Sequence, residues 1–111
     1  GASPGFCSIT AYGKSCEADL KGAWELERPH TVGNASITIR TSRDCIAACH
    51  LCRNCNYISF STSPGFAECS WYSSCDLGLL PKPPVEAPDY MSVAVSKEKP
   101  PSSHQLSLFH R

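Results

Sequence analysis

Eight cysteines in 111 residues limit what this chain can fold into more than any other feature of its sequence. Cytosolic thiols stay reduced, whereas small domains of oxidising compartments use disulfides to make up for a thin hydrophobic core. Leucine, isoleucine and valine are spread thinly here among serine, proline and glycine. An even count of eight allows roughly a hundred complete pairings, so the count alone does not give the connectivity. We therefore expect a domain that folds only when oxidised, each bridge contributing about 2–4 kcal/mol.

Charge and hydropathy argue against two kinds of partner. Ten Lys and Arg balance ten Asp and Glu, and no basic stripe stands out, so nucleic acid is not an expected ligand. No apolar run approaches the roughly 20 residues that span a bilayer. The sequence shows no initiator methionine and no apolar leader, so we expect a mature chain whose targeting segment has been removed. Its expected location is outside the cell or in an oxidising lumen.

Residues 43–52 carry the pattern of a short amphipathic helix. Thr41 is a favourable N-cap, and Asp44 three positions later completes a capping box. Cys45, Cys49 and Cys52 follow at spacings of four and three, which place the three sulfur atoms on one helical face. The sequence therefore predicts a helix whose buried face is rich in cysteine.

Several stretches favour β-strands because apolar and polar residues alternate or β-formers cluster in them. The turn dipeptide Pro64-Gly65 lies between two of them and predicts a hairpin. The expected fold is a small α+β domain in which one short helix packs on an antiparallel sheet of four or five strands. The expected strands are 24–26 (broken by Pro29), 35–40, 55–61, 68–72 and 90–96.

The chain is expected to have three parts. Residues 1–23 are irregular, and Cys7 and Cys16 within them are close enough in sequence to close a local loop. Residues 24–96 form the helix-and-sheet domain. Residues 97–111 are a Pro/Ser-rich arm whose end is more apolar than a free tail should be, with Leu106, Leu108 and Phe109. Such a segment is either disordered, as Pro/Ser/Lys-rich termini usually are, or an arm that extends the sheet edge of a neighbouring subunit by strand addition.

The cysteine and aromatic pattern resembles the PAN/apple family. It consists of Cys45-x3-Cys49, then Cys55-x-Tyr57-x-x-Phe60, then Cys69-x-Trp71. The resemblance covers residues 41–75 and extends to 90–96. It implies a helix lying across a small antiparallel sheet, and it implies adhesion or recognition of a protein or glycan. Residues 55–76 also resemble cysteine-rich modules in secreted or lumenal proteins of unicellular algae.

The same resemblance implies a disulfide framework. Two bridges tie the helix to the sheet in that family, which here gives Cys45–Cys69 and Cys49–Cys55. The remaining cysteines then pair as Cys52–Cys75 and Cys7–Cys16, although the family pattern does not dictate those two bridges.

A metal site is the alternative use of these cysteines. Cys49, Cys52 and Cys55, with His50 beside them, offer ligands for zinc or an iron–sulfur cluster. A structural zinc site usually has two separated knuckles, however, and Asn56 stands where an iron–sulfur run would continue. Disulfides are therefore the preferred interpretation, and we expect no metal and no cofactor.

No pattern in the sequence suggests catalysis. An even cysteine count leaves no free thiol for a nucleophile, and neither a nucleophile elbow nor a phosphate-cradling glycine loop occurs. The four histidines, which are His30, His50, His104 and His110, are interpreted as surface residues. We expect a protein that is not an enzyme and has no catalytic residues.

Aromatic and apolar side chains supply the expected contact surface. Strand alternation points Tyr72 away from Trp71, so one of the two should be exposed. The Asn34-Ala35-Ser36 triplet matches the acceptor pattern for N-glycosylation. The expected contact residues are Trp71, Tyr72, Tyr90, Leu106, Leu108 and Phe109.

The expected function is a non-enzymatic binding or adhesion module for a protein or glycan. The first alternative is a structural accessory subunit, either of an extracellular filament or on the lumenal side of a membrane complex such as an algal photosystem. In that case the C-terminal arm would contact neighbouring subunits. The second alternative is the zinc or iron–sulfur protein.

Overall fold

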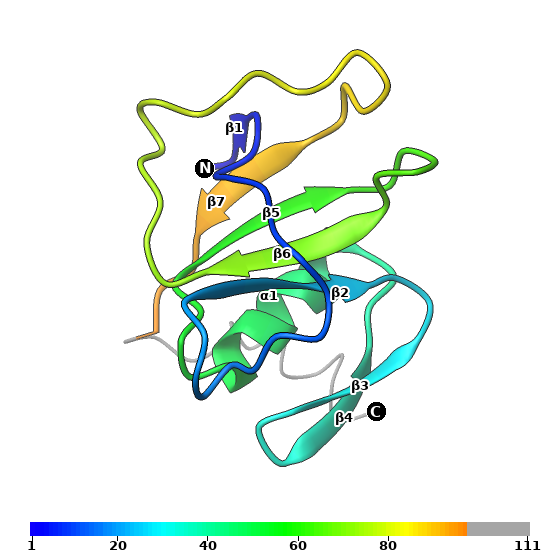
Figure 1. Ribbon diagram of the computed structural model, residues 1–111, viewed down its shortest axis with the longest axis vertical. Coiled ribbons are helices and arrows are strands. Elements are labelled where there is room, and N and C mark those ends of the chain that lie inside the picture. Colours follow the sequence, from blue (N-terminus) through cyan, green and yellow to red (C-terminus); the bar gives the residue numbers. More distant parts are fainter. Residues whose placement is uncertain (98–111) are drawn as a thin grey trace.

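The computed structural model describes residues 1–97, and it confirms the small α+β disulfide-rich fold (Figure 1). One helix, α1 (Ser42–Leu51), lies against an antiparallel sheet of five strands. The strands of that sheet, in spatial order, are β1 (Ser3–Pro4), β7 (Met91–Ala94), β5 (Tyr57–Ser61), β6 (Glu68–Tyr72) and β2 (Lys21–Glu25). A separate two-stranded sheet consists of β3 (Pro29–Val32) and β4 (Ala35–Thr38).

The helix is fixed at both ends by hydrogen bonds. At its N-terminus Thr41 Oγ1 accepts from the Asp44 backbone N–H (3.2 Å), and the Asp44 carboxylate accepts from the Thr41 N–H (3.1 Å), so the expected capping box is present. At its C-terminus the Lys97 ammonium donates to the carbonyls of Cys49 and Cys52. A cation at that end also interacts favourably with the helix dipole.

One face of the sheet is apolar and packs against the helix. Alternation along the strands places Ile58, Phe60, Cys69 and Trp71 on this face, and the register pairs Phe60 with Cys69 and Ile58 with Trp71. Trp24, from β2, stacks near Trp71 with ring centroids 5.9 Å apart. These residues, together with the helix cysteines, form the hydrophobic core.

The opposite face of the sheet is a buried layer of serines. Ser59, Ser61, Ser70 and Ser92 alternate with the core residues, and all four are completely buried. The N-terminal strap, which we define as residues 5–12, covers this face and crosses the sheet on the side away from α1 (Figure 1). Buried hydroxyl groups are costly unless they are hydrogen-bonded, so the strap must supply partners.

Hydrogen bonds between strap and sheet supply those partners. Ser59 Oγ accepts from the Cys7 N–H (3.0 Å) and shares a hydrogen bond with Ser92 Oγ (2.7 Å). Ser92 Oγ in turn donates to the carbonyl of Gly5 (2.8 Å). The Tyr72 hydroxyl donates to the carbonyl of Ser8 (2.7 Å). The strap is therefore an integral layer of the domain.

The connection before β7 is fastened to the end of β5 by one carboxylate. Asp89 accepts hydrogen bonds from the hydroxyls of Ser61 (2.8 Å), Thr62 (2.9 Å) and Ser63 (2.5 Å) and from the Thr62 N–H (2.7 Å). Desolvation raises the pKa of Asp89, but these hydrogen bonds outweigh it and hold the pKa well below its ordinary value.

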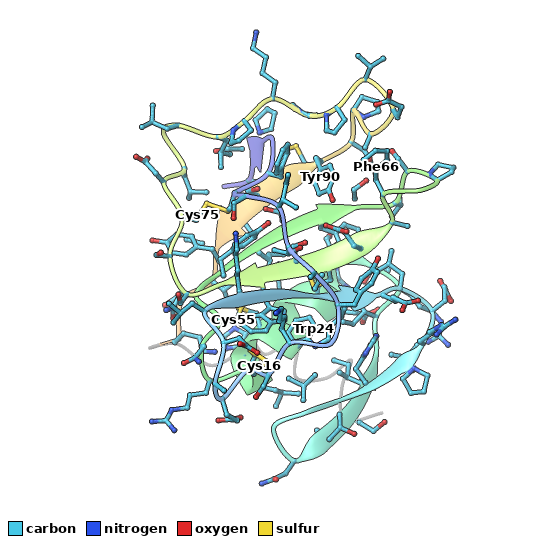
Figure 2. All side chains as sticks on the ribbon, viewed as in Figure 1. Cys16, Trp24, Cys55, Phe66, Cys75 and Tyr90 are labelled. Carbon is cyan, nitrogen blue, oxygen red and sulfur yellow. A yellow bond between two sulfur atoms is a disulfide. The ribbon has the colours of Figure 1, made fainter. Side chains whose placement is uncertain are left out.

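Four disulfides staple the layers together. Cys45–Cys69 and Cys49–Cys55 join the helix to the sheet and to the chain that enters β5, and the PAN/apple resemblance had implied both pairs. Cys16 and Cys55 lie beside α1 (Figure 2). The other two bridges are Cys7–Cys75 and Cys16–Cys52.

The expected Cys7–Cys16 and Cys52–Cys75 pairs are therefore wrong. The chain between the first two crosses the edge of β2, where the Ala23 N–H donates to the Ala11 carbonyl (3.1 Å). Cys7 consequently lies on the serine face and Cys16 on the helix face. Each bonds to the cysteine that its own layer brings near, which is Cys75 just beyond β6 or Cys52 at the helix C-cap.

The expected division of the chain also needs correction. Residues 1–23 include β1 and the start of β2, and they have no bridge of their own. Pro29 ends no strand but begins β3, where its missing N–H is tolerated. The helix, the β5–β6 hairpin, β4 and β7 lie within a few residues of the expected ranges. The C-terminal arm lies outside the described residues, apart from Lys97.

Candidate functional site

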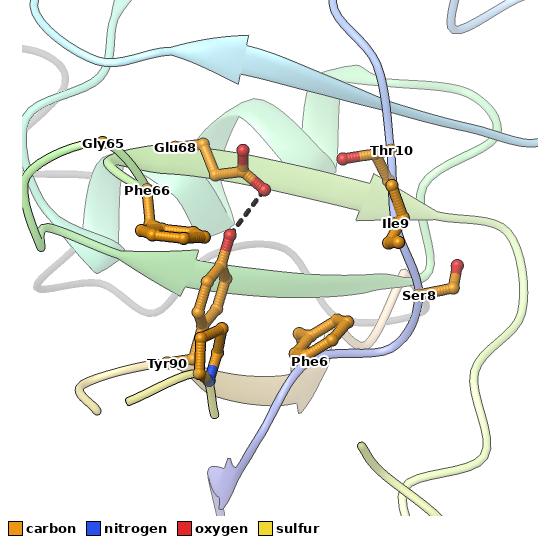
Figure 3. Close-up of a pocket in the computed structure, with 9 residues that line it drawn as sticks. Phe6, Ser8, Ile9, Thr10, Gly65, Phe66, Glu68 and Tyr90 are labelled. Carbon is orange, nitrogen blue, oxygen red and sulfur yellow. Dashed lines mark hydrogen bonds between the residues drawn. The ribbon is translucent and has the colours of Figure 1, made fainter. Parts of the chain in front are cut away.

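The strap borders a groove on the serine-face side of the sheet, with a volume of about 390 Å³ (Figure 3). We call it the strap groove. Its walls come from three segments far apart in sequence: the strap, the β5–β6 hairpin and the connection that leads into β7. The lining residues are Phe6, Ser8, Ile9, Thr10, Gly65, Phe66, Glu68, Pro84 and Tyr90.

Three aromatic rings line the groove. The rings of Phe6 and Tyr90 lie 5.6 Å apart and are tilted by 47°, an arrangement that the ring quadrupoles favour. Phe66 follows the Pro64-Gly65 turn and lies on the other side of Tyr90 (Figure 3). The turn itself depends on Gly65, whose φ of 81° is unfavourable for other residues.

A carboxylate lies at the centre of a hydrogen-bond network in the groove. Glu68 Oε2 accepts from the Tyr90 hydroxyl (2.6 Å) and from Ser70 Oγ (2.6 Å). Ser70 Oγ shares a further hydrogen bond with Thr10 Oγ1 of the strap (2.8 Å). Burial raises the pKa of Tyr90 well above its ordinary value, and its hydrogen bond to the Glu68 carboxylate raises it further.

A second carboxylate lies beside Glu68 on the neighbouring strand. Glu25 of β2 is the direct cross-strand partner of Glu68, so the two side chains point to the same face. Glu25 forms an ion pair with Arg28 (3.3 Å). Burial raises the pKa of Tyr12 from its ordinary value, and the charges of Glu68 and then Glu25 raise it further. Glu68 is therefore the carboxylate of the two that has no ion-pair partner among the described residues.

Two other hollows lie elsewhere on the domain. One lies between α1 and the β5–β7 half of the sheet; it is also about 390 Å³ in volume and is mostly apolar, lined by Ile46, Phe60, Met91 and Val93 among others. A smaller one of about 220 Å³ lies next to His30, whose ring forms a hydrogen bond with the Glu25 carbonyl (2.7 Å). The strap groove differs from both in its three aromatic rings, because Phe60 is the aromatic side chain of the first hollow and Tyr12 and Trp24 are those of the second.

The expected contact residues divide into three groups. The prediction that Trp71 and Tyr72 belong to the contact surface is wrong, because their exposed fractions are 0% and 2%. Alternation did point them to opposite faces, but the helix covers one face and the strap covers the other. Tyr90 is largely buried and lines the strap groove. Leu106, Leu108 and Phe109 lie outside the described residues.

Of the lining residues only Tyr90 was an expected contact residue, so the other two aromatic rings, Phe6 and Phe66, and the carboxylate of Glu68 were missed. A signal for the covered face existed, because serine alternates with core residues in β5, β6 and β7. That pattern ordinarily indicates a solvent-exposed face. Nothing in the pattern shows that a distant segment covers it.

The cysteines of the proposed metal alternative are all disulfide-bonded. Cys49, Cys52 and Cys55 are each joined to another cysteine sulfur, and no free cysteine is present. Their sulfur atoms are therefore not thiolate ligands in this structure. Within residues 1–97 no helix is both long enough and apolar enough to cross a membrane.

Comparison of the chain with protein-family models, with curated proteins and with solved structures finds no significant match.

Proposed function

We propose that this domain is a non-enzymatic binding module of an oxidising compartment, secreted or lumenal, that recognises a protein or glycan through the strap groove. The observation that supports this most directly is the groove itself. Aromatic rings next to a few convergent polar groups are the usual composition of a recognition site. The four disulfides are consistent with such a compartment. The PAN/apple resemblance supports the same class of function and stays a prediction.

The groove is better suited to recognition than to chemistry. Glu68, its carboxylate, already accepts two short hydrogen bonds from Tyr90 and Ser70. These contacts hold the carboxylate in a fixed orientation, which is the requirement for a preorganised binding group. We therefore assign no catalytic residue and no cofactor.

The test is a binding screen with a matched pair of variants. The oxidised protein is applied to an array of oligosaccharides and to an array of synthetic peptides. Phe66→Ala removes one aromatic wall of the groove, and Leu79→Ala removes an apolar side chain that is 79% exposed and does not line the groove. We expect specific signals that Phe66→Ala abolishes and Leu79→Ala preserves. Signals that both variants retain would show that binding does not use the strap groove.

A second candidate function is a structural accessory subunit, as in an extracellular filament or on the lumenal side of a photosystem-like complex. The observation that favours it is the apolar surface of the 77–90 connection, where Leu79 and Val85 are 79% and 93% exposed. Exposed apolar side chains are available to contact a partner protein. Obligate co-purification with large partners would support this candidate, and a monomer on a sizing column would favour the binding module.

Asn34 is the proposed glycan acceptor. It lies exposed in the two-residue turn between β3 and β4, after Gly33, whose φ of 60° suits the first position of such a turn. Expression through a secretory pathway should therefore give a mass that falls on treatment with an N-glycosidase. Asn34→Gln should give the unmodified mass directly, and an unmodified wild-type protein would contradict the assignment.

A further inference from the structure

The charge around Glu68 is unbalanced, although the chain as a whole is neutral. The ion pairs among the described residues are Arg28–Glu25 and Arg40–Glu27, and neither involves Glu68. Its cross-strand neighbour is Glu25, which has the same charge. Like charges directly opposite each other in a sheet are destabilising. Glu25 is compensated by Arg28, whereas Glu68 has no ion-pair partner among the described residues, so the charge of Glu68 is the one that a bound cation would balance.

A lysine contacts a residue at the other end of the groove. Lys21 donates a hydrogen bond from Nζ to Ser8 Oγ (3.2 Å). It is paired with Tyr72 at the far end of β6, four residues from Glu68 along that strand. At about 3.3 Å per residue this is about 13 Å along the strand, so Lys21 does not neutralise Glu68 at contact distance.

The remaining walls of the groove also suit a cation. The faces of aromatic rings carry negative potential, and they attract ammonium and guanidinium groups within about 6 Å. Figure 3 shows the Tyr90 hydroxyl directed at the Glu68 carboxylate, with Phe66 on one side of the Tyr90 ring and Phe6 on the other. Glu68 Oε2 is occupied by two hydrogen bonds, whereas no residue within 1–97 donates to Oε1, which leaves that oxygen available to a ligand.

We propose that the strap groove binds the positively charged side chain of a lysine or arginine presented by a partner protein. The proposal rests on the binding function above and specifies its ligand. A protein is favoured over an amino sugar because apolar side chains flank the groove. Ile9 lines it and is 81% exposed, and Val85, next to the lining residue Pro84, is 93% exposed. A charged anchor surrounded by apolar contacts is typical of protein interfaces.

The experiment is a titration of the oxidised, isotopically labelled protein followed by NMR. The probes are the capped tripeptides Gly-Arg-Gly and Gly-Lys-Gly. Their neutral counterparts contain citrulline and Nε-acetyl-lysine, which retain shape and lose charge. Glucosamine and N-acetylglucosamine form a third arm. We expect saturable shifts at Thr10, Phe66 and Glu68 with the cationic peptides, and at least about tenfold weaker binding of the neutral ones.

Variants separate charge from shape. Glu68→Gln retains a hydrogen-bond acceptor but removes the charge, so it should weaken the binding of the cationic peptides at least about tenfold. Phe66→Leu retains an apolar side chain but removes the aromatic ring, so it should weaken the binding of these peptides severalfold. Glu17→Gln, an exposed carboxylate that does not line the groove, is the control and should change nothing. Intact mass and the melting temperature establish that each variant is folded with four bridges.

Three results would overturn the inference: equal binding of charged and neutral peptides, unchanged affinity in Glu68→Gln, or shifts with glucosamine alone. These results leave the proposed function testable on its own. Suppose that binding of an array ligand requires Phe66 but is unchanged in Glu68→Gln. That result would support recognition through the strap groove and refute the proposal that the groove binds a cationic side chain. Array signals that are independent of Phe66 would instead refute the groove.

Discussion

The bridge between Cys7 and Cys75 anchors the strap. Of the four bridges, it is the one whose removal should cost the most through the conformational entropy of the unfolded chain. The bridge joins residues 68 apart in sequence. A loop of that length contributes about 4 kcal/mol by restricting the unfolded chain. Both half-cystines are partly exposed, so Cys7→Ala with Cys75→Ala leaves little cavity behind. The free energy of unfolding should therefore fall by about 4 kcal/mol, out of a typical total of about 5–15 kcal/mol.

Equilibrium unfolding in urea measures this loss. With a slope of about 2 kcal/mol per molar urea, the midpoint should move down by about 2 M. Trp24 and Trp71 are buried, so their fluorescence reports the transition. The matched control is the double alanine variant of Cys49 and Cys55, which are only six residues apart. Its entropic loss is about 2 kcal/mol, to which the loss of buried sulfur contacts must be added.

The connectivity itself is part of this prediction. Once Cys7 and Cys75 are replaced, the oxidised variant should contain three bridges and no free thiol, because the other six cysteines retain their partners. Two free thiols per chain would contradict the pairing of Cys7 with Cys75. A stability loss below about 1 kcal/mol would refute the entropic reasoning, since the long loop would then be restricted by something other than the bridge.

Three further substitutions test the layers of the fold. Ser59→Ala removes a buried hydroxyl that is bonded to Ser92, and urea unfolding should show a loss of about 1–3 kcal/mol. Gly22→Ala would place a Cβ 2.6 Å from Cζ2 of Trp71, so calorimetry should show a lower melting temperature, equivalent to about 1–3 kcal/mol. Asp89→Asn should cost about 1 kcal/mol at neutral pH, a value reduced by the exposure of the group. The pKa of Asp89 is lower in the folded protein than its ordinary value of 3.8. The stabilisation by the ionised carboxylate is therefore present above pH 3.8 and is lost as the pH falls below that value. The free energies of unfolding of wild type and Asp89→Asn should accordingly converge in acid.

The parts of the fold that local sequence could predict are those governed by local interactions. Thr41 and Asp44 are three positions apart and define the start of the helix without help from the rest of the chain. Pro64 and Gly65 define a turn between two strands in the same way. The bridges implied by family resemblance also lie close in sequence, with separations of 24 and 6 residues.

The parts that were missed depend on distant segments. The two bridges that the sequence analysis did not predict correctly join cysteines that are 68 and 36 residues apart in sequence. The burial of Tyr72 depends on the strap, whose Ser8 carbonyl accepts a hydrogen bond from the Tyr72 hydroxyl, 64 positions away in sequence. Periodicity states which side chains share a face, but it does not state whether that face is covered. The candidate site was missed for the same reason, because its walls meet only after the strap has closed.

The serine face explains why the strap and the groove belong together. A face of small hydroxyl side chains offers little hydrophobic gain, so hydrogen bonds and a covalent tie must hold the covering segment. Cys7 provides that tie, and its sequence neighbours Phe6 and Ser8 line the groove. The bridge that fastens the strap therefore also fixes one wall of the groove against Glu68 and Tyr90. Reduction of this single bridge should release the groove wall before it disturbs the core, because the helix is held to the sheet by other cysteines.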